Sequence, residues 1–158
     1  MSGLLIRAGV PQDVEALLGV QRDACTTAFA HIFPPEQYPF PDEAVREEWQ
    51  KSLSGETVEV HVAEVEGLPA GVVTIDGEFL GQLYVLPEHQ GGGVGSALHD
   101  HALERLRAGG NERARLWCLE ENLNARRFYE RRGWELTEET RVVPFPPNPI
   151  DVQYAKSL

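Results

Sequence analysis

The glycines at positions 91, 92, 93 and 95 are the residues whose spacing points most directly to chemistry. They separate the apolar run "LYVL", residues 83–86, from a stretch of helical periodicity that begins at Val94. A strand that ends in a glycine-rich turn and leads into a helix directs unpaired N–H groups and the positive end of the helix dipole at one small volume. The alternative is a turn that is merely flexible. Ordering adjacent glycines costs roughly 1 kcal/mol each relative to alanine, so a functional reason for them is favoured. The segment therefore predicts a site for a phosphate group.

Two familiar phosphate-binding loops do not fit this segment. A Walker A loop needs a lysine after its last glycine, and residues 91–96 contain no lysine. A Rossmann fingerprint that starts at Gly93 and Gly95 would require a third glycine where Leu98 stands. A nucleoside triphosphatase and a plain nucleotide-binding domain are therefore disfavoured.

The elements that must position this loop follow from hydrophobic periodicity and turn residues. The pairs Glu66-Gly67 and Asp76-Gly77 are hairpin signals, and glycines end two of the helical stretches. The predicted order is strand 4–8, helix 11–28, irregular segment 30–43, helix 43–52, strands 57–65, 68–75 and 78–86, helix 94–108, strand 113–120, helix 122–133, and strands 134–143 and 150–158. We expect a single α+β domain over residues 1–158, with a mixed, mostly antiparallel sheet of about six or seven strands flanked by about four helices.

Composition restricts the function classes. The 158 residues carry a formal net charge of -11, which disfavours nucleic acid and anionic membranes as partners because both attract basic surfaces. Arg7 and Asp13 interrupt the first apolar run, so neither a signal peptide nor a membrane span is predicted, and we expect a cytoplasmic protein. Cys25 and Cys118 form no CxxC pair, which predicts neither a disulfide framework nor a metal site.

The basic residues are unevenly spread along the chain. Lysine and arginine are absent from Ser52 to Glu104, whereas arginines crowd the stretch that follows. These arginines are Arg105, Arg107, Arg113, Arg115, Arg126, Arg127, Arg131 and Arg132. Without an anionic ligand they are surface charges of helices and strands.

Two segments together resemble one known family. The stretch "VLPEHQGGGVGSAL" is similar to motif A of the GNAT acetyltransferase superfamily, (Q/R)-x-x-G-x-(G/A), with Gln90, Gly93 and Gly95 at its positions. The later stretch "ENLNARRFYERRGWE" resembles motif B of the same family, and its matching residues are Asn122, Ala125, Phe128, Tyr129, Gly133 and Trp134. The order of the other predicted elements agrees with this family over nearly the whole chain. The resemblance implies a mixed sheet splayed around acetyl-CoA.

The resemblance also implies roles for individual residues. The backbone N–H of Val85 would hold the thioester carbonyl, where negative charge grows during attack. The diphosphate of acetyl-CoA would bind the amides of Gln90, Gly91, Gly92, Gly93, Val94, Gly95 and Ser96, and glycine would suit this loop because a Cβ would hold the phosphate off. Asn122 would contact the pantetheine arm, and Tyr129 would both contact the co-substrate and protonate the departing thiolate. Acetyl-CoA is the expected co-substrate, and no metal is expected.

Tyr129 has a simpler interpretation as well. A helical tyrosine beside Phe128 is commonly a core aromatic with its hydroxyl at the rim. Because the ordinary pKa is about 10 for tyrosine and about 8.5 for a thiol, full proton transfer to the thiolate is uphill by roughly 1.5 pKa units. We therefore expect Tyr129 to act by hydrogen bonding as charge develops, or to have its pKa lowered by Arg126 or Arg132.

The base that removes the proton of the acceptor is less defined. An amine with a pKa of about 10.4 is neutral in about one of several thousand molecules at pH 7, so a base is needed. Many family members carry a glutamate on the motif A strand, but Gln82 occupies that region here, and an amide is no base. His31, in the segment where the family builds its acceptor pocket, is the candidate catalytic base, and Glu78 and Glu120 are alternatives that would work through water. His99 and His101 diverge on their helix, so they form a poor metal pair and are expected to face solvent.

The sequence thus predicts an N-acetyltransferase that moves the acetyl group of acetyl-CoA to a primary amine by direct attack in a ternary complex. Since the loop holds no basic residue, co-substrate binding is expected to depend on Arg126 or Arg127. A small-molecule or peptide amine is the expected partner, and the acidic composition favours a cationic one. A homodimer is an alternative to a monomer, and another acyl-CoA is an alternative donor. A non-catalytic acyl-CoA-binding regulatory module is the alternative function, kept open by Gln82.

Overall fold

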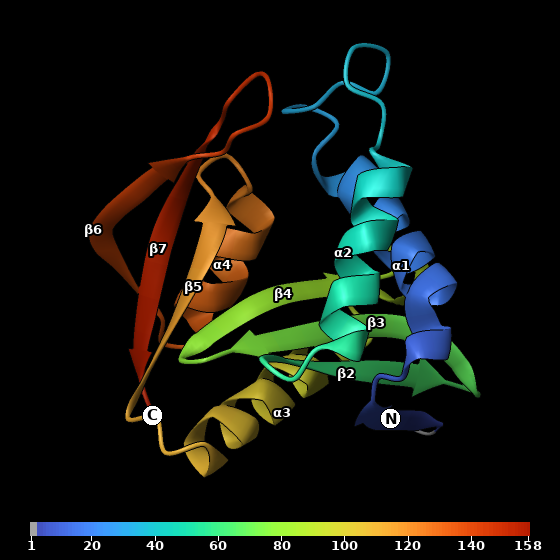
Figure 1. Ribbon diagram of the computed structural model, residues 1–158. Helices are drawn as coiled ribbons and strands as arrows, with labels where there is room; N and C mark the ends of the chain where they lie inside the picture. The colour runs from blue at the N-terminus through green and yellow to red at the C-terminus, as the bar shows by residue number, and fades with distance from the viewer. Residues whose placement is uncertain (1–2) are drawn as a thin grey trace.

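The computed structural model describes residues 3–158, which form one sheet with the strand order β1-β2-β3-β4-β5-β7-β6. The strands are β1 (Leu4–Ala8), β2 (Val58–Val65), β3 (Leu68–Asp76), β4 (Phe79–Val85), β5 (Arg113–Leu119), β6 (Glu135–Val142) and β7 (Ile150–Ser157). The helices are α1 (Val14–Ala28), α2 (Asp42–Ser54), α3 (Val94–Ala108) and α4 (Leu123–Arg131), with short 3-10 turns at Pro11–Asp13 and Pro87–His89. Among the strands of the described residues, only β4 and β5 pair in parallel. This is the mixed, mostly antiparallel sheet with four helices that the sequence predicts (Figure 1).

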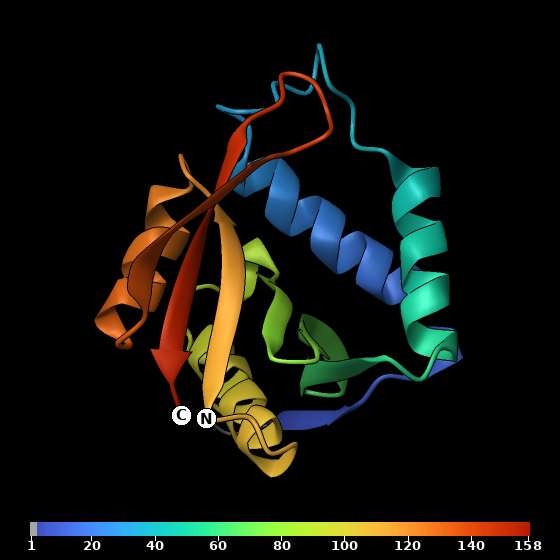
Figure 2. The same ribbon diagram turned by 60° about the vertical axis from the view of Figure 1, so that its left-hand side comes forward.

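Helices cover both faces of the sheet. One core cluster joins α1 and Trp49 of α2 to Val62 and Val72. The other joins α3 to the next residues along the same strands, Ala63 and Val73. Because neighbouring residues of a strand point to opposite faces, α1 and α2 pack on the face opposite to α3. Figure 2 shows this arrangement, with α3 below strands β2–β4 and the two N-terminal helices above them.

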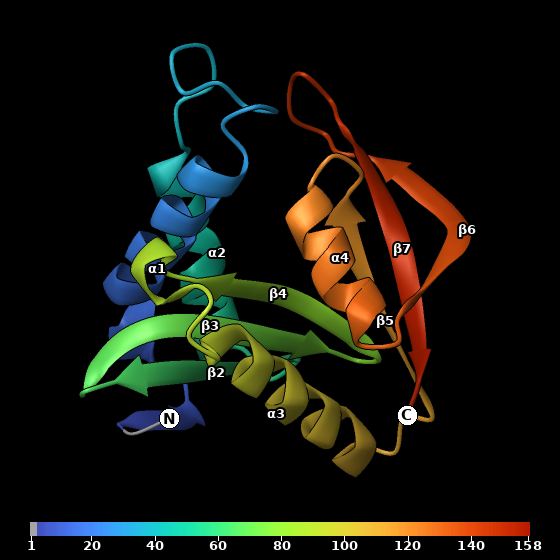
Figure 3. The same ribbon diagram turned by 180° about the vertical axis from the view of Figure 1, so that it is seen from behind.

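The sheet opens between its two parallel strands. A bulge on β4 interrupts the β3–β4 register, because Gly81 and Gln82 lie opposite the single residue Thr74 of β3. A Cβ at Gly81 would lie 2.6 Å from the Thr74 hydroxyl, so this close approach favours glycine. Bulges bend the strands that carry them. The β4–β5 register contains only the pair Phe79 and Arg115, and the strands separate beyond it (Figures 1 and 3). We call the region where β4 and β5 no longer pair the split. Strands β1–β4 with α1–α3 form the N-terminal arm, and β5–β7 with α4 form the C-terminal arm.

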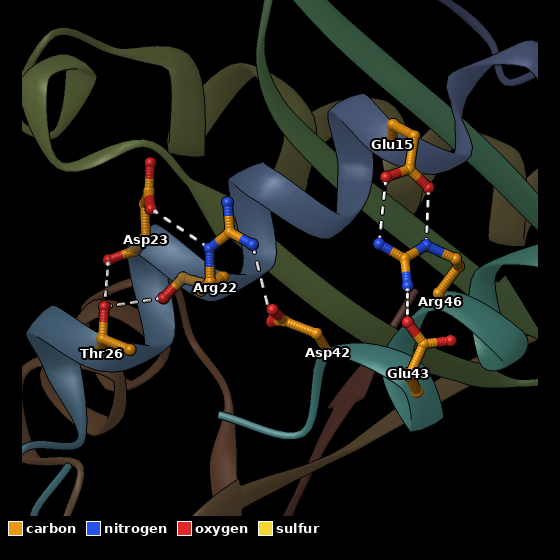
Figure 4. A network of polar contacts seen from close by, with 7 residues as sticks. All are labelled: Glu15, Arg22, Asp23, Thr26, Asp42, Glu43 and Arg46. Carbon is orange, nitrogen blue, oxygen red and sulfur yellow. Dashed lines mark hydrogen bonds and ion pairs between the residues drawn. The ribbon is translucent and has the colours of Figure 1, made fainter. Parts of the chain in front are cut away.

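Helices α1 and α2 lie beside the split and are connected to each other by ion pairs. Arg46 of α2 donates to both carboxylate oxygens of Glu15 at 2.7 and 3.1 Å and also contacts Glu43, and Arg22 lies 3.5 Å from Asp42 (Figure 4). Exposed ion pairs contribute little stability individually. The apolar contacts of Trp49 are therefore the main source of stability for this pair, and the ion pairs orient its outer side. None of the helices within residues 3–158 combines the length and the apolar character that a membrane span requires.

Candidate active site

The glycine loop connects the end of β4 to the start of α3. Gly91 and Gly93 have φ values of 79° and 92°, and Gly93 is the N-cap of α3. A side chain in this left-handed region costs about 1–2 kcal/mol, so these two positions require glycine for their backbone conformation. Gly95 differs, because a Cβ there would make ordinary contacts of 3.7 Å with Val85 and Phe128. At Gly95 the Cβ would therefore be tolerated by the protein, and the expectation that a Cβ in this loop holds off a phosphate stays a prediction.

Several backbone amides of this loop have no partner within residues 3–158. The amides of Gln90 and Gly92 already donate to loop carbonyls at 3.2 and 3.3 Å. The structure gives no hydrogen bond to the remaining amides of the predicted set, which are Gly91, Gly93, Val94, Gly95 and Ser96. The Gln90 side chain donates to the Val85 carbonyl oxygen at 3.2 Å and so closes the loop onto the strand end. The open amides and the start of α3 form a cradle for an anion.

The two strand edges at the split carry free backbone groups. The Leu86 N–H donates to the Ala70 carbonyl on β3 at 2.8 Å, so by alternation the N–H of Val85 points toward β5. The Arg115 N–H donates to the Glu78 carbonyl at 3.1 Å, which directs the N–H groups of Trp117 and Leu119 toward β4 by the same rule. The pairing between β4 and β5 has already ended at these positions. The split therefore presents backbone donors from both arms, with Val85 next to the glycine loop.

Tyr129 of α4 packs in the core cluster that also contains residues of α3 and β5. Its ring meets those of Phe128 and Trp134 edge-on, with centroids 5.3 and 5.9 Å apart. Burial raises the pKa of Tyr129 well above its usual range, and the opposing effect of the Arg132 charge is smaller. Arg132 thus acts on the pKa of Tyr129 in the expected direction, but burial outweighs it, so the pKa is not lowered overall. A charge on Tyr129 would also raise the pKa of Tyr84 on β4, so the two hydroxyls lie within electrostatic reach across the split.

Asn122 begins α4. Its side-chain Oδ1 accepts a hydrogen bond from the Ala125 N–H at 3.3 Å, which is the usual contact of a helix N-cap. Its own N–H donates to the Leu119 carbonyl at 3.0 Å. Asn122 therefore fixes the turn from β5 into α4 at one end of the split, and its side-chain NH₂ group remains for a ligand.

His31 lies between the two arms. Its Nε2 is 3.1 Å from the Glu121 carbonyl oxygen, and because a carbonyl only accepts, Nε2 must donate. In the neutral ring the lone pair is then on Nδ1. The surrounding hollow of about 350 Å³ is lined by His31, Ile32, Glu120, Glu121, Pro147, Pro149 and Ile150. His31 thus belongs to this hollow, whereas Tyr129 belongs to the core around α3 and β5.

Gln82 takes part in a polar network that local sequence patterns do not reveal. Its Nε2 and the Nε2 of Gln21 both donate to the Tyr84 hydroxyl at 3.4 Å. Gln21 in turn accepts from the Trp49 indole N–H at 2.8 Å. Burial raises the pKa of Tyr84 and, to about 12, that of Cys25 beside it. The network is therefore neutral at ordinary pH, and it orients the Gln82 amide group on β4.

Arg126 and Arg127 are the arginines on which co-substrate binding is expected to depend, and the structure gives their surroundings. Arg126 donates to the Tyr154 hydroxyl at 2.9 Å and to the Glu120 carbonyl at 3.0 Å, and Arg127 is exposed beside Asn124. Arg132 instead contacts Ser96 at the start of α3. The arginine next to the glycine loop is thus Arg132.

The expectation that His99 faces solvent is wrong, because its side chain is buried. Its Nε2 accepts from the Trp134 indole N–H at 2.9 Å, and burial lowers its pKa. Within residues 3–158, no three His, Cys, Asp or Glu side chains are grouped so that they could hold a metal ion.

A family model described as "Acetyltransferase (GNAT) family" matches residues 24–134, a range that includes the glycine loop, the split and α4. The chain belongs to the GNAT family. The family predicted from the two sequence motifs is thereby confirmed.

Relatives and solved structures of the GNAT family are similar to this chain over nearly its whole length. The mycothiol acetyltransferase of Saccharomonospora viridis is 32% identical to this chain over 98% of this chain and 49% of that relative, so the chain spans about half of its length. A GCN5-related N-acetyltransferase from Rhodopseudomonas palustris superposes with a TM-score of 0.83 at 23% identity, covering 100% of this chain and 98% of that one. The PaiA N-acetyltransferase of Thermoplasma acidophilum, solved in complex with coenzyme A, gives a TM-score of 0.73 at 22% identity over the whole of both chains. These structures share the GNAT fold with this chain.

Proposed function

We propose that this chain is an acetyl-CoA-dependent N-acetyltransferase that acetylates a primary amine of a small molecule or peptide by direct attack in a ternary complex. The observation that carries the proposal is the split, where β4 ends in the free Val85 N–H and the open amides of the glycine loop, while α4 of the other arm carries the buried Tyr129. An acyl transfer needs a donor where an oxyanion forms and a proton source where a thiolate leaves. The two sides of the split supply one of each.

The proposed reaction forms an N–C bond and breaks the C–S bond of the thioester. The Val85 N–H would hold the thioester oxygen as it gains negative charge, and the Asn122 amide and the facing N–H groups of β5 would hold the pantetheine arm. Tyr129 stays protonated because burial raises its pKa. Its hydroxyl would therefore donate a hydrogen bond to the sulfur as the C–S bond breaks, and the released thiolate would take its proton from water.

His31 is the proposed base for the amine proton. The contact of Nε2 with the Glu121 carbonyl leaves Nδ1 as the position that can accept a proton. Glu78 is less suited, because its carboxylate already accepts from Arg115 at 3.2 Å at the closed end of the split. Glu120 lines the same hollow as His31 and remains the alternative base.

For the acceptor we propose a chemical class. Two glutamates and apolar side chains line the hollow that contains His31. Carboxylates favour a cationic group, and the apolar wall favours a short hydrocarbon part. A cationic amine, such as a polyamine or the N-terminus of a peptide, fits this lining.

A thiol-release assay with acetyl-CoA and a panel of polyamines, amino-acid amides and short peptides tests the proposal. We expect amine-dependent release of CoA, with the turnover of Tyr129→Phe lower by on the order of a hundredfold or more. Tyr154→Phe is the matched control, because the Tyr154 hydroxyl is bound inside the protein by Arg126 and Glu130. This variant should lose stability but keep turnover. Full activity of Tyr129→Phe would remove Tyr129 from the mechanism.

A non-catalytic acyl-CoA-binding module is the second candidate. It is favoured by Gln82, whose amide group is fixed by Tyr84 where a carboxylate base would serve. Stoichiometric binding of acetyl-CoA without turnover on any acceptor, combined with equal affinity in the native protein and in His31→Ala, would support it.

A further inference from the structure

Arg132 follows the last residue of α4 and is half-buried against the start of α3. Its Nη2 donates to the Ser96 hydroxyl at 2.5 Å, and its Nη1 donates to the Phe128 carbonyl at 3.0 Å. The guanidinium carbon lies 3.6 Å from the centroid of the Phe128 ring. Since Ser96 is in the first turn of α3, these contacts hold a cation beside the open amides of the glycine loop.

This cation has no carboxylate partner within the described part of the chain. The arginines that do have one within 4.0 Å are Arg7, Arg22, Arg46, Arg105, Arg115 and Arg141. A guanidinium has five N–H donors, and Arg132 uses two of them in the contacts above. A half-buried charge is costly when unpaired, and an aromatic face offsets this cost only in part. The surroundings of Arg132 therefore lack an anion.

Ser96 strengthens the same conclusion. Its hydroxyl accepts the hydrogen bond from Arg132, so its own proton remains to be donated. The amides of Gly93, Val94, Gly95 and Ser96 have no partner within residues 3–158. A cation, a hydroxyl donor and several amides thus adjoin one another, and all of them are donors that an anion can satisfy.

We propose that Arg132 binds the diphosphate of the acyl-CoA substrate together with the first-turn amides of α3. This inference rests on the proposed function, because it uses the same site, and it adds a ligand that comes from α4. The glycine loop contains no basic residue, and Arg126 is occupied by Tyr154 and Glu120. The diphosphate is favoured over the ribose phosphate because Arg132 contacts the same helical turn whose amides are open.

Binding of three compounds, measured calorimetrically, tests the inference. Coenzyme A carries the diphosphate and the 3′-phosphate, dephospho-coenzyme A lacks only the 3′-phosphate, and pantetheine lacks both. We expect Arg132→Gln to weaken binding of the first two compounds equally, on the order of tenfold to a hundredfold, the range for charge-assisted hydrogen bonds. Pantetheine binding should not change. Arg131→Gln is the matched control, because Arg131 is the exposed neighbour and its loss changes the net charge equally.

Arg132→Lys provides a second variant, since lysine keeps the charge but lacks the planar fork. It should recover part of the lost affinity if the contact is electrostatic. Thermal unfolding of each variant shows whether the protein is folded. A loss for coenzyme A but not for dephospho-coenzyme A would overturn the inference in favour of the 3′-phosphate. An equal loss for pantetheine, or no loss relative to Arg131→Gln, would also overturn it. If the native protein bound none of the three compounds, the proposed function itself would fail.

Discussion

Tyr129 shows how the environment of one residue decides its chemistry. A tyrosine and a thiol with ordinary pKa values exchange a proton unfavourably, and burial of Tyr129 raises its pKa further. Ionisation of Tyr129 is therefore suppressed, and its hydroxyl remains a hydrogen-bond donor at alkaline pH. The residue suits a role in which it stabilises charge on sulfur without holding that charge itself.

We expect that the turnover of the native protein does not fall through ionisation of Tyr129 up to about pH 10, the ordinary pKa of tyrosine. The sign follows from burial, which raises the pKa of Tyr129 and keeps its protonated form present above that pH. The measurement is a pH profile of kcat with saturating acetyl-CoA and an amine acceptor. An alkaline decrease that is centred below pH 10 and disappears in Tyr129→Phe would contradict this expectation.

The places of residues in the fold were predictable where short patterns carry them and not where distant segments meet. The two motifs indicated Val85, the glycines and Tyr129 because each lies in a local stretch of strand, turn or helix. The contact of Arg132 with Ser96 joins positions 36 residues apart, and that of His31 with Glu121 joins positions 90 apart. Local periodicity contains no distance of this kind, so the sequence indicated Arg126 or Arg127 and not Arg132, which the structure places beside the glycine loop.

At the scale of elements, the junction of β4 and α3 contains one glycine, Gly93, that its backbone conformation requires and another, Gly95, that it does not. Gly93→Ala should lower the free energy of unfolding by about 1–2 kcal/mol, because its φ of 92° is unfavourable for alanine. The variant should also bind coenzyme A more weakly, since the amides of the cradle would shift.

Gly95→Ala is the matched comparison in the same loop. A Cβ there makes only ordinary contacts, and alanine is favoured over glycine inside a helix. Its stability should therefore equal or exceed that of the native protein. Urea unfolding and coenzyme A titration of both variants check the pair, and equal destabilisation by the two substitutions would show that backbone conformation is not the deciding factor.

The start of α1 is fastened to β1 by a buried carboxylate. Asp13 accepts from Arg7 at 2.8 and 2.9 Å and from the Val10 N–H at 2.8 Å. The hydrogen bonds from Arg7 are the main cause that lowers the pKa of Asp13 in the folded protein. A carboxyl group with a lowered pKa contributes stability above its unfolded pKa of about 3.9, and this contribution is lost as the pH falls through the folded pKa.

We therefore expect Asp13→Asn to lower the free energy of unfolding at pH 7 by about 2 kcal/mol, the usual contribution of hydrogen bonds to a charged group. The difference from the native protein should decrease as the pH falls below about 4, because the carboxyl group of the unfolded chain becomes protonated there before that of the folded protein. Asp23→Asn, at an exposed position of α1, is the control and should change stability by less than about 0.5 kcal/mol. Urea unfolding at both pH values checks this, and a difference independent of pH would exclude the charge of Asp13 as the cause.

The elements themselves were predictable, but their arrangement was only partly so. Glu66 and Gly67 have positive φ values of 51° and 80°, so the hairpin read from the sequence forms as expected. The position of β7 between β5 and β6 could not be read, because pairing of β5 with β7 depends on contacts across the intervening helix and strand. The split is likewise absent from local patterns, since it lies between β4 and β5, which are separated in the sequence by α3.

At the scale of the whole molecule, the net charge of the protein has the same sign as the charge of its proposed ligand. The net charge is -11, yet the proposed ligand is itself a polyanion. The arginine-rich stretch 105–132 forms the end of α3, β5 and α4, so the positive charge is concentrated in and beside the C-terminal arm. This distribution allows an anion to approach the split from that arm while the hollow around His31 remains acidic.

The two arms share a core on the α3 side and contacts such as those of Arg132 with Ser96 and Trp134 with His99, but β4 and β5 share only one backbone pair, so a ligand in the split should link their open edges. Coenzyme A at about 100 times its Kd should raise the free energy of unfolding by about 2.7 kcal/mol, which corresponds to a Tm increase of about 5–11 °C for a domain of this size. Amide hydrogen exchange should slow at Val85 on one arm and at Trp117 and Leu119 on the other, because these N–H groups face the split. Slower exchange on one arm alone, or stabilisation without slower exchange at Val85, would show that coenzyme A binds elsewhere and that the open strand edges are not its site.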